Sequence, residues 1–226
     1  MAEEKNTNQE LDQVLGQFGK LEEFIQKNTK LVYGIAAVVV FGAVGYFFYK
    51  DKAENDELDA QKELYTAQYF FAKDSIDLVL NGDGNNVTGV TEVVEEYGTT
   101  KAGNLAKFYA GVLYLKKGEY DLAIDYLKDF SSSDVLVQAR AYSLIGDAYL
   151  ETQAFQEAID FYEKAANTYP NESFTPKYLA KLAIAYEKIN DLEKATATYD
   201  EILLQFPNSS EANNAKKYKA LIAKAI

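Results

Sequence analysis

The most constraining feature of the chain is a stretch of 19 residues, Leu31 to Tyr49, that contains no charged side chain. A helix over this stretch is about 28 Å long, which is close to the thickness of the hydrocarbon core of a bilayer. Aromatic residues lie near both of its ends, at Tyr33 and at positions 46–49, and Lys30 and Lys50 flank it. Aromatic and lysine side chains are typical of the two membrane interfaces. The stretch therefore predicts a single transmembrane helix over residues 31–49.

Two other interpretations of this stretch are a buried core helix and a cleaved signal peptide. A core helix of a soluble domain normally carries a polar stripe, and this stretch has none. A signal peptide has a shorter apolar centre that ends at small residues, whereas this stretch ends in aromatic residues followed by Lys50 and Asp51. The sequence therefore favours an uncleaved membrane anchor.

The composition excludes several kinds of site. The chain has no Cys and no His, so disulfides, thiolate metal ligands and the commonest general base are absent. Its net charge of −12 argues against nucleic acid as a partner, because a phosphate backbone requires a basic surface. The sequence has no Gly-rich phosphate loop, and its many carboxylates are most simply a solvated surface. We therefore expect no enzyme activity, no metal and no cofactor.

Residues 1–30 are predicted to form a polar tail, over residues 1–10, followed by a short amphipathic helix. Apolar residues recur there at the spacing of one helical face, at Leu11, Val14, Leu15, Phe18, Leu21 and Ile25. The polar face is rich in Glu and Asp, which favours a protein partner over a lipid surface. A partly ordered segment without a partner is the alternative. Three lysines lie within fifteen residues on each side of the span, so the lysine count leaves the membrane orientation undecided.

Residues 50–103 are predicted to form a stalk helix and a degenerate helix pair. A helical stripe continues beyond the span at Leu58, Tyr65, Tyr69, Ala72, Ile76 and Val79. The polar run at 81–86 is predicted to be an interhelical turn. A second helix is expected over residues 91–97, ending at Gly98.

Three blocks of similar sequence fill residues 104–209. Ala123, Ala158 and Ala195 mark equivalent positions in the blocks and lie 35 and 37 residues apart. This spacing, with Gly or Ala, Tyr and Pro at fixed positions, is the tetratricopeptide pattern, in which each repeat is a pair of antiparallel helices. Residues 210–226 are predicted to form a capping helix. The predicted fold class is therefore all-α, with a single transmembrane helix followed by a right-handed tetratricopeptide-repeat solenoid.

The block pattern also predicts local packing. Small residues in the first helix of each repeat, Gly111, Gly146 and Ala183, are expected to let the second helix approach closely. Thr175 followed by Pro176 is a helix-start signal, a capping side chain followed by proline in the first turn.

Four positions in the first helix of each repeat are expected to line the concave face of the solenoid, and these are the candidate partner-binding residues. We call them the inner-face set: Leu105, Phe108, Val112, Leu115, Arg140, Ser143, Asp147, Leu150, Lys177, Ala180, Ile184 and Glu187. The set mixes apolar and polar side chains. Its apolar members are alternatively expected to pack against the first helix of the next repeat.

The order of parts resembles the bacterial YfgM-type family of single-spanning ancillary subunits of the Sec translocon. The resemblance rests on Phe24, Asn28 and Lys30 before the span, on the aromatic residues 46–49 at the end of the span, and on the helical repeats that follow. It implies a protein of the bacterial inner membrane with a cytoplasmic N-terminus and a periplasmic repeat domain. It also implies Sec translocon subunits and periplasmic chaperones as partners.

Two functions from different classes follow. The first is a membrane-anchored protein–protein interaction adaptor that links the Sec translocon to periplasmic chaperones or emerging clients. The second is a structural scaffold that organises a membrane or cell-envelope complex without binding clients, and it predicts one stoichiometric partner. An enzyme is a distant third interpretation, because nothing in the sequence names a substrate.

Overall fold

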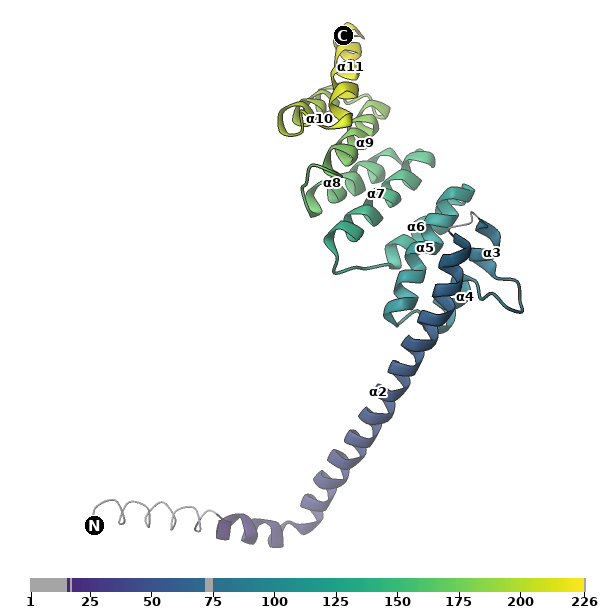
Figure 1. Ribbon diagram of the computed structural model, residues 1–226. Helices are drawn as coiled ribbons and strands as arrows, with labels where there is room; N and C mark the ends of the chain where they lie inside the picture. The colour runs from purple at the N-terminus through teal and green to yellow at the C-terminus, as the bar shows by residue number, and fades with distance from the viewer. Residues whose placement is uncertain (1–15, 17, 72–74, 226) are drawn as a thin grey trace, which may run out of the picture. The chain divides into compact units, whose positions relative to one another are not determined.

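The computed structural model describes residues 16, 18–71 and 75–225, and its regular elements over these residues are all helices (Figure 1). They are α2 (Thr29–Phe71), α3 (Ile76–Asn81), α4 (Val90–Tyr97), α5 (Lys101–Lys117), α6 (Tyr120–Asp129), α7 (Val135–Glu151), α8 (Phe155–Thr168), α9 (Thr175–Lys188), α10 (Leu192–Gln205) and α11 (Ser210–Ala225). The all-α prediction is confirmed. The chain divides into two compact units, Met1–Asn55 and Asp56–Ile226, which we describe separately.

The first unit contains a helical segment over residues 18–27, a turn at Asn28 and the first part of α2. By length and composition, α2 is a candidate membrane-spanning helix. None of the residues in its most apolar stretch of 18 residues is buried within the protein. The core helix of a soluble protein would bury most of such a stretch. The predicted tail at 1–10 and the apolar positions Leu11, Val14 and Leu15 lie outside the described residues.

The second unit begins with the last part of α2, whose buried face differs from the predicted stripe. Leu58, Tyr65 and Tyr69 are 50%, 73% and 55% exposed, and the helix instead buries Ala60, Leu64 and Ala67. These residues share a core cluster with alanines of α5, so small side chains on both helices permit close packing. The predicted stripe is also interrupted, because α2 ends at Phe71 and α3 begins at Ile76, and Ala72 lies outside the described residues.

A carboxylate of α2 caps the start of α5. Glu57 Oε2 accepts hydrogen bonds from the backbone N–H groups of Lys101 and Ala102, at 2.6 and 3.2 Å. Partial burial alone would raise the pKa of Glu57, but these bonds and one from Gln61 lower it below its ordinary value. The first N–H groups of a helix have no partner within the helix, so this carboxylate satisfies two of them and joins α2 to the first repeat.

The turn between α3 and α4 is organised by Asp83. Its Oδ1 accepts hydrogen bonds from the backbone N–H groups of Asn85, Asn86 and Val87, at 2.9, 2.7 and 2.9 Å. These three bonds stabilise the charged form, so they lower the pKa of the carboxyl. The interhelical turn predicted for 81–86 is confirmed, and α4 ends at Tyr97 with Gly98 as its C-terminal cap, as expected.

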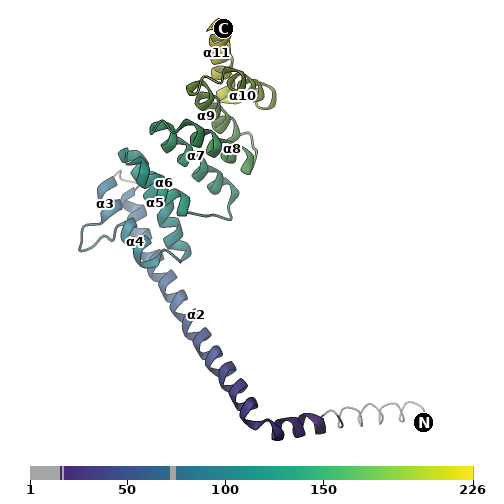
Figure 2. The same cartoon turned by 180° about the vertical axis from the view of Figure 1, so that it is seen from behind.

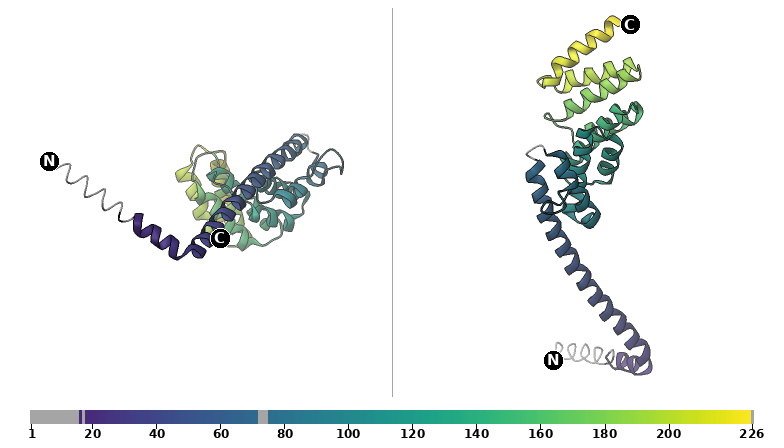
Figure 3. Two further views of the ribbon diagram at one scale, coloured as in Figure 1. Left: turned by 90° about the horizontal axis from the view of Figure 1, so that it is seen from below. Right: turned by 90° about the vertical axis from the view of Figure 1, so that its right-hand side faces the viewer.

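Three helix pairs follow: α5 with α6, α7 with α8, and α9 with α10. Each helix packs against the next along the chain, and α11 packs on α10 and α9. Figures 1 and 2 show this succession from opposite sides, and the right-hand view of Figure 3 separates the last helices. The arrangement matches the predicted repeats.

In the first two pairs, a small residue in the first helix faces a large residue in the second. A Cβ atom added at Gly146 would lie 2.6 Å from Cε1 of Tyr162, and one added at Gly111 would overlap the side chain of Leu127. Both large residues are buried. The predicted close crossing is therefore present in the first two repeats, and it leaves no space for a methyl group at Gly146 without movement of a rigid ring.

The turns inside the three pairs share one backbone feature. Gly118, Gln153 and Asn190 occupy equivalent positions and have positive φ angles of 79°, 62° and 59°. Glycine and asparagine adopt this left-handed conformation readily at helix C-termini, whereas glutamine does so at a cost. The middle turn is therefore the least favourable of the three.

One predicted helix start is wrong by one residue. The capping position of α9 is Phe174, and Thr175 is already the first helical residue. The Thr175 hydroxyl accepts a hydrogen bond of 2.8 Å from the N–H of Asn171, and Asn171 Oδ1 accepts from the N–H groups of Ser173 and Phe174. The turn before α9 is thus closed by Asn171, while Pro176 lies in the first turn as predicted.

Candidate protein-binding surface

The inner-face set is contributed by α5, α7 and α9, with four residues from each helix. Arg140 and Lys177 are exposed, and Ser143 is buried, with 3% of its surface exposed. The remaining members are partly exposed: Leu105, Phe108, Val112, Leu115, Asp147, Leu150, Ala180, Ile184 and Glu187. Most of the set is therefore accessible to a partner. Ser143 is not accessible, so it can affect a partner only through the residues around it.

Several apolar members of the set also pack within the domain. Leu150 and Ala180 pack against the core cluster of the second and third repeats, and Leu105 packs against the cluster shared by α2 and α5. The ring of Phe108 lies 5.2 Å from that of Phe130, centroid to centroid. These residues hold the solenoid together while exposing part of their surface.

A hollow of about 280 Å³ lies beside the first helix of the set. Its walls come from α2 and α5 and include Leu64, Tyr65, Ala102 and Leu105. Tyr65 is largely exposed, so the hollow opens to solvent on one side. The lining also includes Glu57, Gln61, Gln68 and Lys101, so the hollow offers both apolar and polar side chains to a ligand.

A polar network links α7, α8 and α9 at the centre of the set. Lys181 Nζ lies 2.7 Å from Asp147 Oδ2 and donates to Ser143 Oγ at 3.2 Å. The Tyr162 hydroxyl donates a hydrogen bond of 2.8 Å to the other oxygen, Asp147 Oδ1. Burial, and then the nearby carboxylate, raise the pKa of Tyr162 far above its ordinary value, so this hydroxyl is a permanent donor.

Two further tyrosine hydroxyls donate to carboxylates. Tyr199 bonds Glu187 Oε1, a member of the set, and Tyr186 bonds Glu163 Oε1, each at 2.6 Å. Burial first, and these bonds second, raise the pKa of both tyrosines. The tetratricopeptide pattern places tyrosines at fixed positions in each repeat but does not predict their acceptors. A buried tyrosine hydroxyl requires a partner, and that requirement is the signal that points to nearby carboxylates.

The exposed cations of the set stand at equivalent positions in α7 and α9. Arg140 is the single arginine of a chain whose net charge is −12. Burial raises the pKa of Tyr178, and the nearby charge of Arg140 offsets part of that rise, which places Arg140 beside α9. Lys177 Nζ lies 5.7 Å from the ring centroid of Phe174. The set therefore presents two exposed cations in a predominantly acidic protein, together with the partly exposed carboxylates Asp147 and Glu187.

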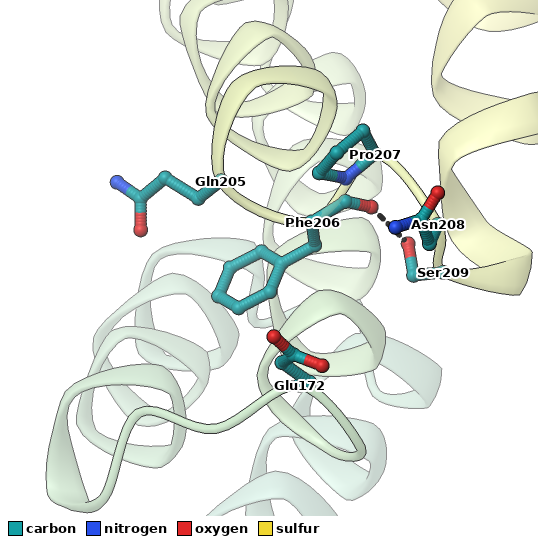
Figure 4. Close-up of a pocket in the computed structure, with 6 residues that line it drawn as sticks. All are labelled: Glu172, Gln205, Phe206, Pro207, Asn208 and Ser209. Atoms are coloured by element: carbon teal, nitrogen blue, oxygen red, sulfur yellow. Dashed lines mark hydrogen bonds between the residues drawn. The ribbon is translucent and has the colours of Figure 1, made fainter.

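A cavity of about 100 Å³ lies outside the inner-face set, at the turn between α10 and α11 (Figure 4). It is lined by Glu172, Gln205, Phe206, Pro207, Asn208 and Ser209. Both the N–H and the hydroxyl of Ser209 donate to the carbonyl oxygen of Phe206, at 3.0 and 2.8 Å. The carbonyl oxygen of Phe206 therefore already accepts hydrogen bonds from within the turn. Glu172 is the single ionisable residue of this lining. The cavity is a packing feature of the turn that contains Pro207.

The described residues 16, 18–71 and 75–225 contain no group of three or more His, Cys, Asp or Glu that could hold a metal ion. The successive helix pairs have the fold of tetratricopeptide repeats. Two tetratricopeptide-repeat family models match the chain, over residues 108–173 and 149–224. Repeats of this class mediate protein–protein interactions.

Two relatives are described as uncharacterized protein ycf37, one from Pyropia yezoensis and one from Guillardia theta. The chain is 33% and 31% identical to them over 118 residues. The match covers 51% and 50% of this chain and 65% of each relative, so it spans slightly less than two thirds of their length. These relatives do not identify the chain as a translocon subunit.

Solved structures of MamA are similar in part. The RS-1 ArsTM double mutant is 22% identical, with a TM-score of 0.43 over 68% of this chain and 93% of that chain. The MSR-1 C2 structure is 19% identical, with a TM-score of 0.43 over 74% and 98%.

Proposed function

We propose that this chain is a membrane-anchored adaptor whose tetratricopeptide repeats bind protein partners through the inner-face set. The observation that carries the proposal is the combination of the repeats with the exposed apolar window of α2. An apolar helix of this length is stable when lipid covers it. The proposed division of the chain is a lead-in over 1–30, a span over 31–49, a stalk over 50–103, repeats over 104–209 and a cap over 210–226. No catalytic role is part of the proposal.

The chemistry of the inner-face set favours a partner segment with both apolar and acidic residues. Val112 and Ile184 offer partly exposed apolar surface, and Arg140 and Lys177 offer exposed positive charge. Charge complementarity increases the rate and specificity of association more than the affinity. We therefore expect binding to weaken and slow as the salt concentration rises.

In a more specific form of the proposal, the protein partners are Sec translocon subunits, periplasmic chaperones or emerging clients. Its support is the resemblance of the order of parts to the YfgM-type family. In this form the protein lies in a bacterial inner membrane, with its N-terminus in the cytoplasm and its repeats in the periplasm. Protease treatment of intact spheroplasts tests the orientation, because a C-terminal tag on Ile226 is then digested from outside. Protection of the tag until lysis would contradict the periplasmic placement.

The alternative is a scaffold that holds one membrane complex together without binding clients. Crosslinking in intact membranes, followed by detection of translocon subunits and of a secreted test substrate, separates the two functions. The adaptor predicts crosslinks to both. A single stoichiometric partner, lost from the membrane complex when Phe108 and Leu150 are replaced by charged residues, would support the scaffold instead.

A further inference from the structure

The helical segment 18–27 presents an apolar face that none of the described residues of the first unit covers. Phe18, Leu21, Phe24 and Ile25 are 61%, 54%, 52% and 41% exposed. They project over about one third of the helix circumference, because residues three and four apart share a face. The other side carries Lys20, Glu22, Glu23, Gln26 and Lys27. The segment is therefore amphipathic, and its polar side is balanced in charge.

A bend separates this segment from α2, as Figures 1 and 3 show. The chain makes a turn at Asn28, whose side-chain amide donates to the carbonyl oxygen of Phe24 at 3.0 Å. The Thr29 hydroxyl donates to the carbonyl oxygens of Gln26 and Ile25, at 2.8 and 3.2 Å. Hydroxyl groups that bond to carbonyls of the preceding turn bend helices. The bend is therefore stabilised by the side chains of Asn28, which lies between the segment and α2, and of Thr29, the first residue of α2.

The segment ends a few residues before the apolar stretch that starts at Leu31. If α2 crosses a bilayer, as proposed above, residues 18–27 are tethered at the level of the lipid headgroups. A straight continuation of α2 would carry the four apolar side chains away into water. The bend instead turns the segment out of the direction of α2, so its apolar face can lie against the same bilayer.

We infer that residues 18–27 form an interfacial helix, which lies along the surface of the bilayer with Phe18, Leu21, Phe24 and Ile25 in the boundary between headgroups and acyl chains. This inference rests on the proposed membrane anchor. Amphipathic helices with phenylalanine and leucine on one face and charges on the other bind in this way. The sequence-based preference for a protein partner depended on an acidic polar face, and over 18–27 two lysines balance two glutamates.

The test uses the full-length protein in phosphatidylcholine–phosphatidylglycerol vesicles, with one spin label on each variant. The chain contains no cysteine, so each introduced cysteine is unique. Leu21→Cys and Phe24→Cys probe the apolar side, Glu23→Cys and Gln26→Cys are matched controls on the polar side, and Val39→Cys probes the span. The collision rates of each label with oxygen, which partitions into lipid, and with a water-soluble nickel chelate are measured. Circular dichroism confirms that the labelled variants remain helical.

We expect a several-fold lower nickel collision rate and a higher oxygen collision rate at Leu21 and Phe24 than at Glu23 and Gln26. The label at Val39 is expected to collide with oxygen and not with nickel, as a label inside the lipid does. Equal nickel access at all four positions, with Val39 in lipid, would overturn the interfacial helix and leave the anchor intact. Nickel access at Val39 would overturn the anchor itself and this inference with it. A third outcome is that the labels at Leu21 and Phe24 are shielded from both reagents and show spin–spin broadening that disappears when unlabelled protein is added. This outcome would show that a second copy of the protein covers the apolar face, and it would overturn contact with lipid.

Discussion

The Tyr162 hydroxyl donates a hydrogen bond of 2.8 Å to Asp147 Oδ1, and this bond joins the two helices of the middle repeat. Tyr162 is fully buried, and Asp147 belongs to the inner-face set. The bond therefore connects the core of the repeat to the surface proposed to bind partners. Lys181 holds the second carboxylate oxygen, so the position of Asp147 is fixed from α8 and from α9.

Replacing Tyr162 by Phe removes the donor and leaves the ring in place. Hydrogen bonds to charged groups contribute about 1.5–3 kcal/mol, so we expect the free energy of unfolding to fall by about that amount. Urea denaturation measures the change. Tyr65→Phe, at an exposed tyrosine of α2, is the matched control and is expected to leave stability unchanged. A Tyr162→Phe variant as stable as the parent would show that the bond contributes nothing.

Replacing Gly146 by Ala tests the close crossing of α7 and α8. The added methyl group meets the ring of Tyr162 at 2.6 Å, so one helix has to shift. Overpacking of a core typically costs about 1–3 kcal/mol, and we expect a decrease in this range together with a lower thermal midpoint. Glu151→Ala, at an exposed position of the same helix, serves as the control. A Gly146→Ala variant with increased stability, as helix propensity alone would give, would contradict the packing described.

Replacing Gln153 by Gly removes the unfavourable left-handed conformation of a residue with a side chain from the middle turn. The left-handed conformation costs a residue with a side chain about 1–2 kcal/mol, and the greater freedom of glycine in the unfolded chain removes part of the gain. We expect the free energy of unfolding to rise by about 0.5–1 kcal/mol in thermal or urea unfolding. The reciprocal change, Gly118→Ala at φ of 79°, is expected to destabilise the first turn. Opposite signs for the two variants support the assignment, and equal signs would refute it.

The turn at Asp83 gives the protein a specific acid sensitivity. Its pKa is lowered in the folded state by three backbone hydrogen bonds, so the carboxylate stabilises the fold above its unfolded pKa of about 3.9. That contribution disappears as the pH falls through the unfolded and then the folded pKa. We expect the stability of the parent to decline more steeply below pH about 4 than that of Asp83→Asn. Parallel pH profiles of the two proteins, measured by urea unfolding, would exclude the effect.

Periodic features of the sequence predict most of the repeat architecture. Ala123, Ala158 and Ala195 recur at nearly constant spacing because each repeat buries the same helix crossing. The small residues Gly111 and Gly146 lie at crossings for the same reason. Such positions are visible in a sequence because only one kind of side chain fits them.

Features that depend on the choice between two faces or two neighbours are less predictable. The stripe through Leu58, Tyr65 and Tyr69 is as periodic as the buried one, and hydrophobicity alone favours the larger side chains. Close packing against α5 selects Ala60 and Ala67 instead. In the same way, Thr175 resembles a cap, but the preceding turn is closed by Asn171. The partners of tyrosine hydroxyls, and therefore the centre of the candidate surface, require the tertiary structure.

Partner binding through the inner-face set is the central claim, and site-specific photocrosslinking in native membranes tests it most directly. A photoreactive phenylalanine is placed at Lys177 or Ile184 of α9, and at Asp125 or Glu157 on the exposed sides of α6 and α8 as controls. We predict crosslinks to a protein partner from the inner-face positions, lost when Arg140 is replaced by Glu, and none from the controls. Crosslinks from the outer positions alone, or none from α9, would contradict the account.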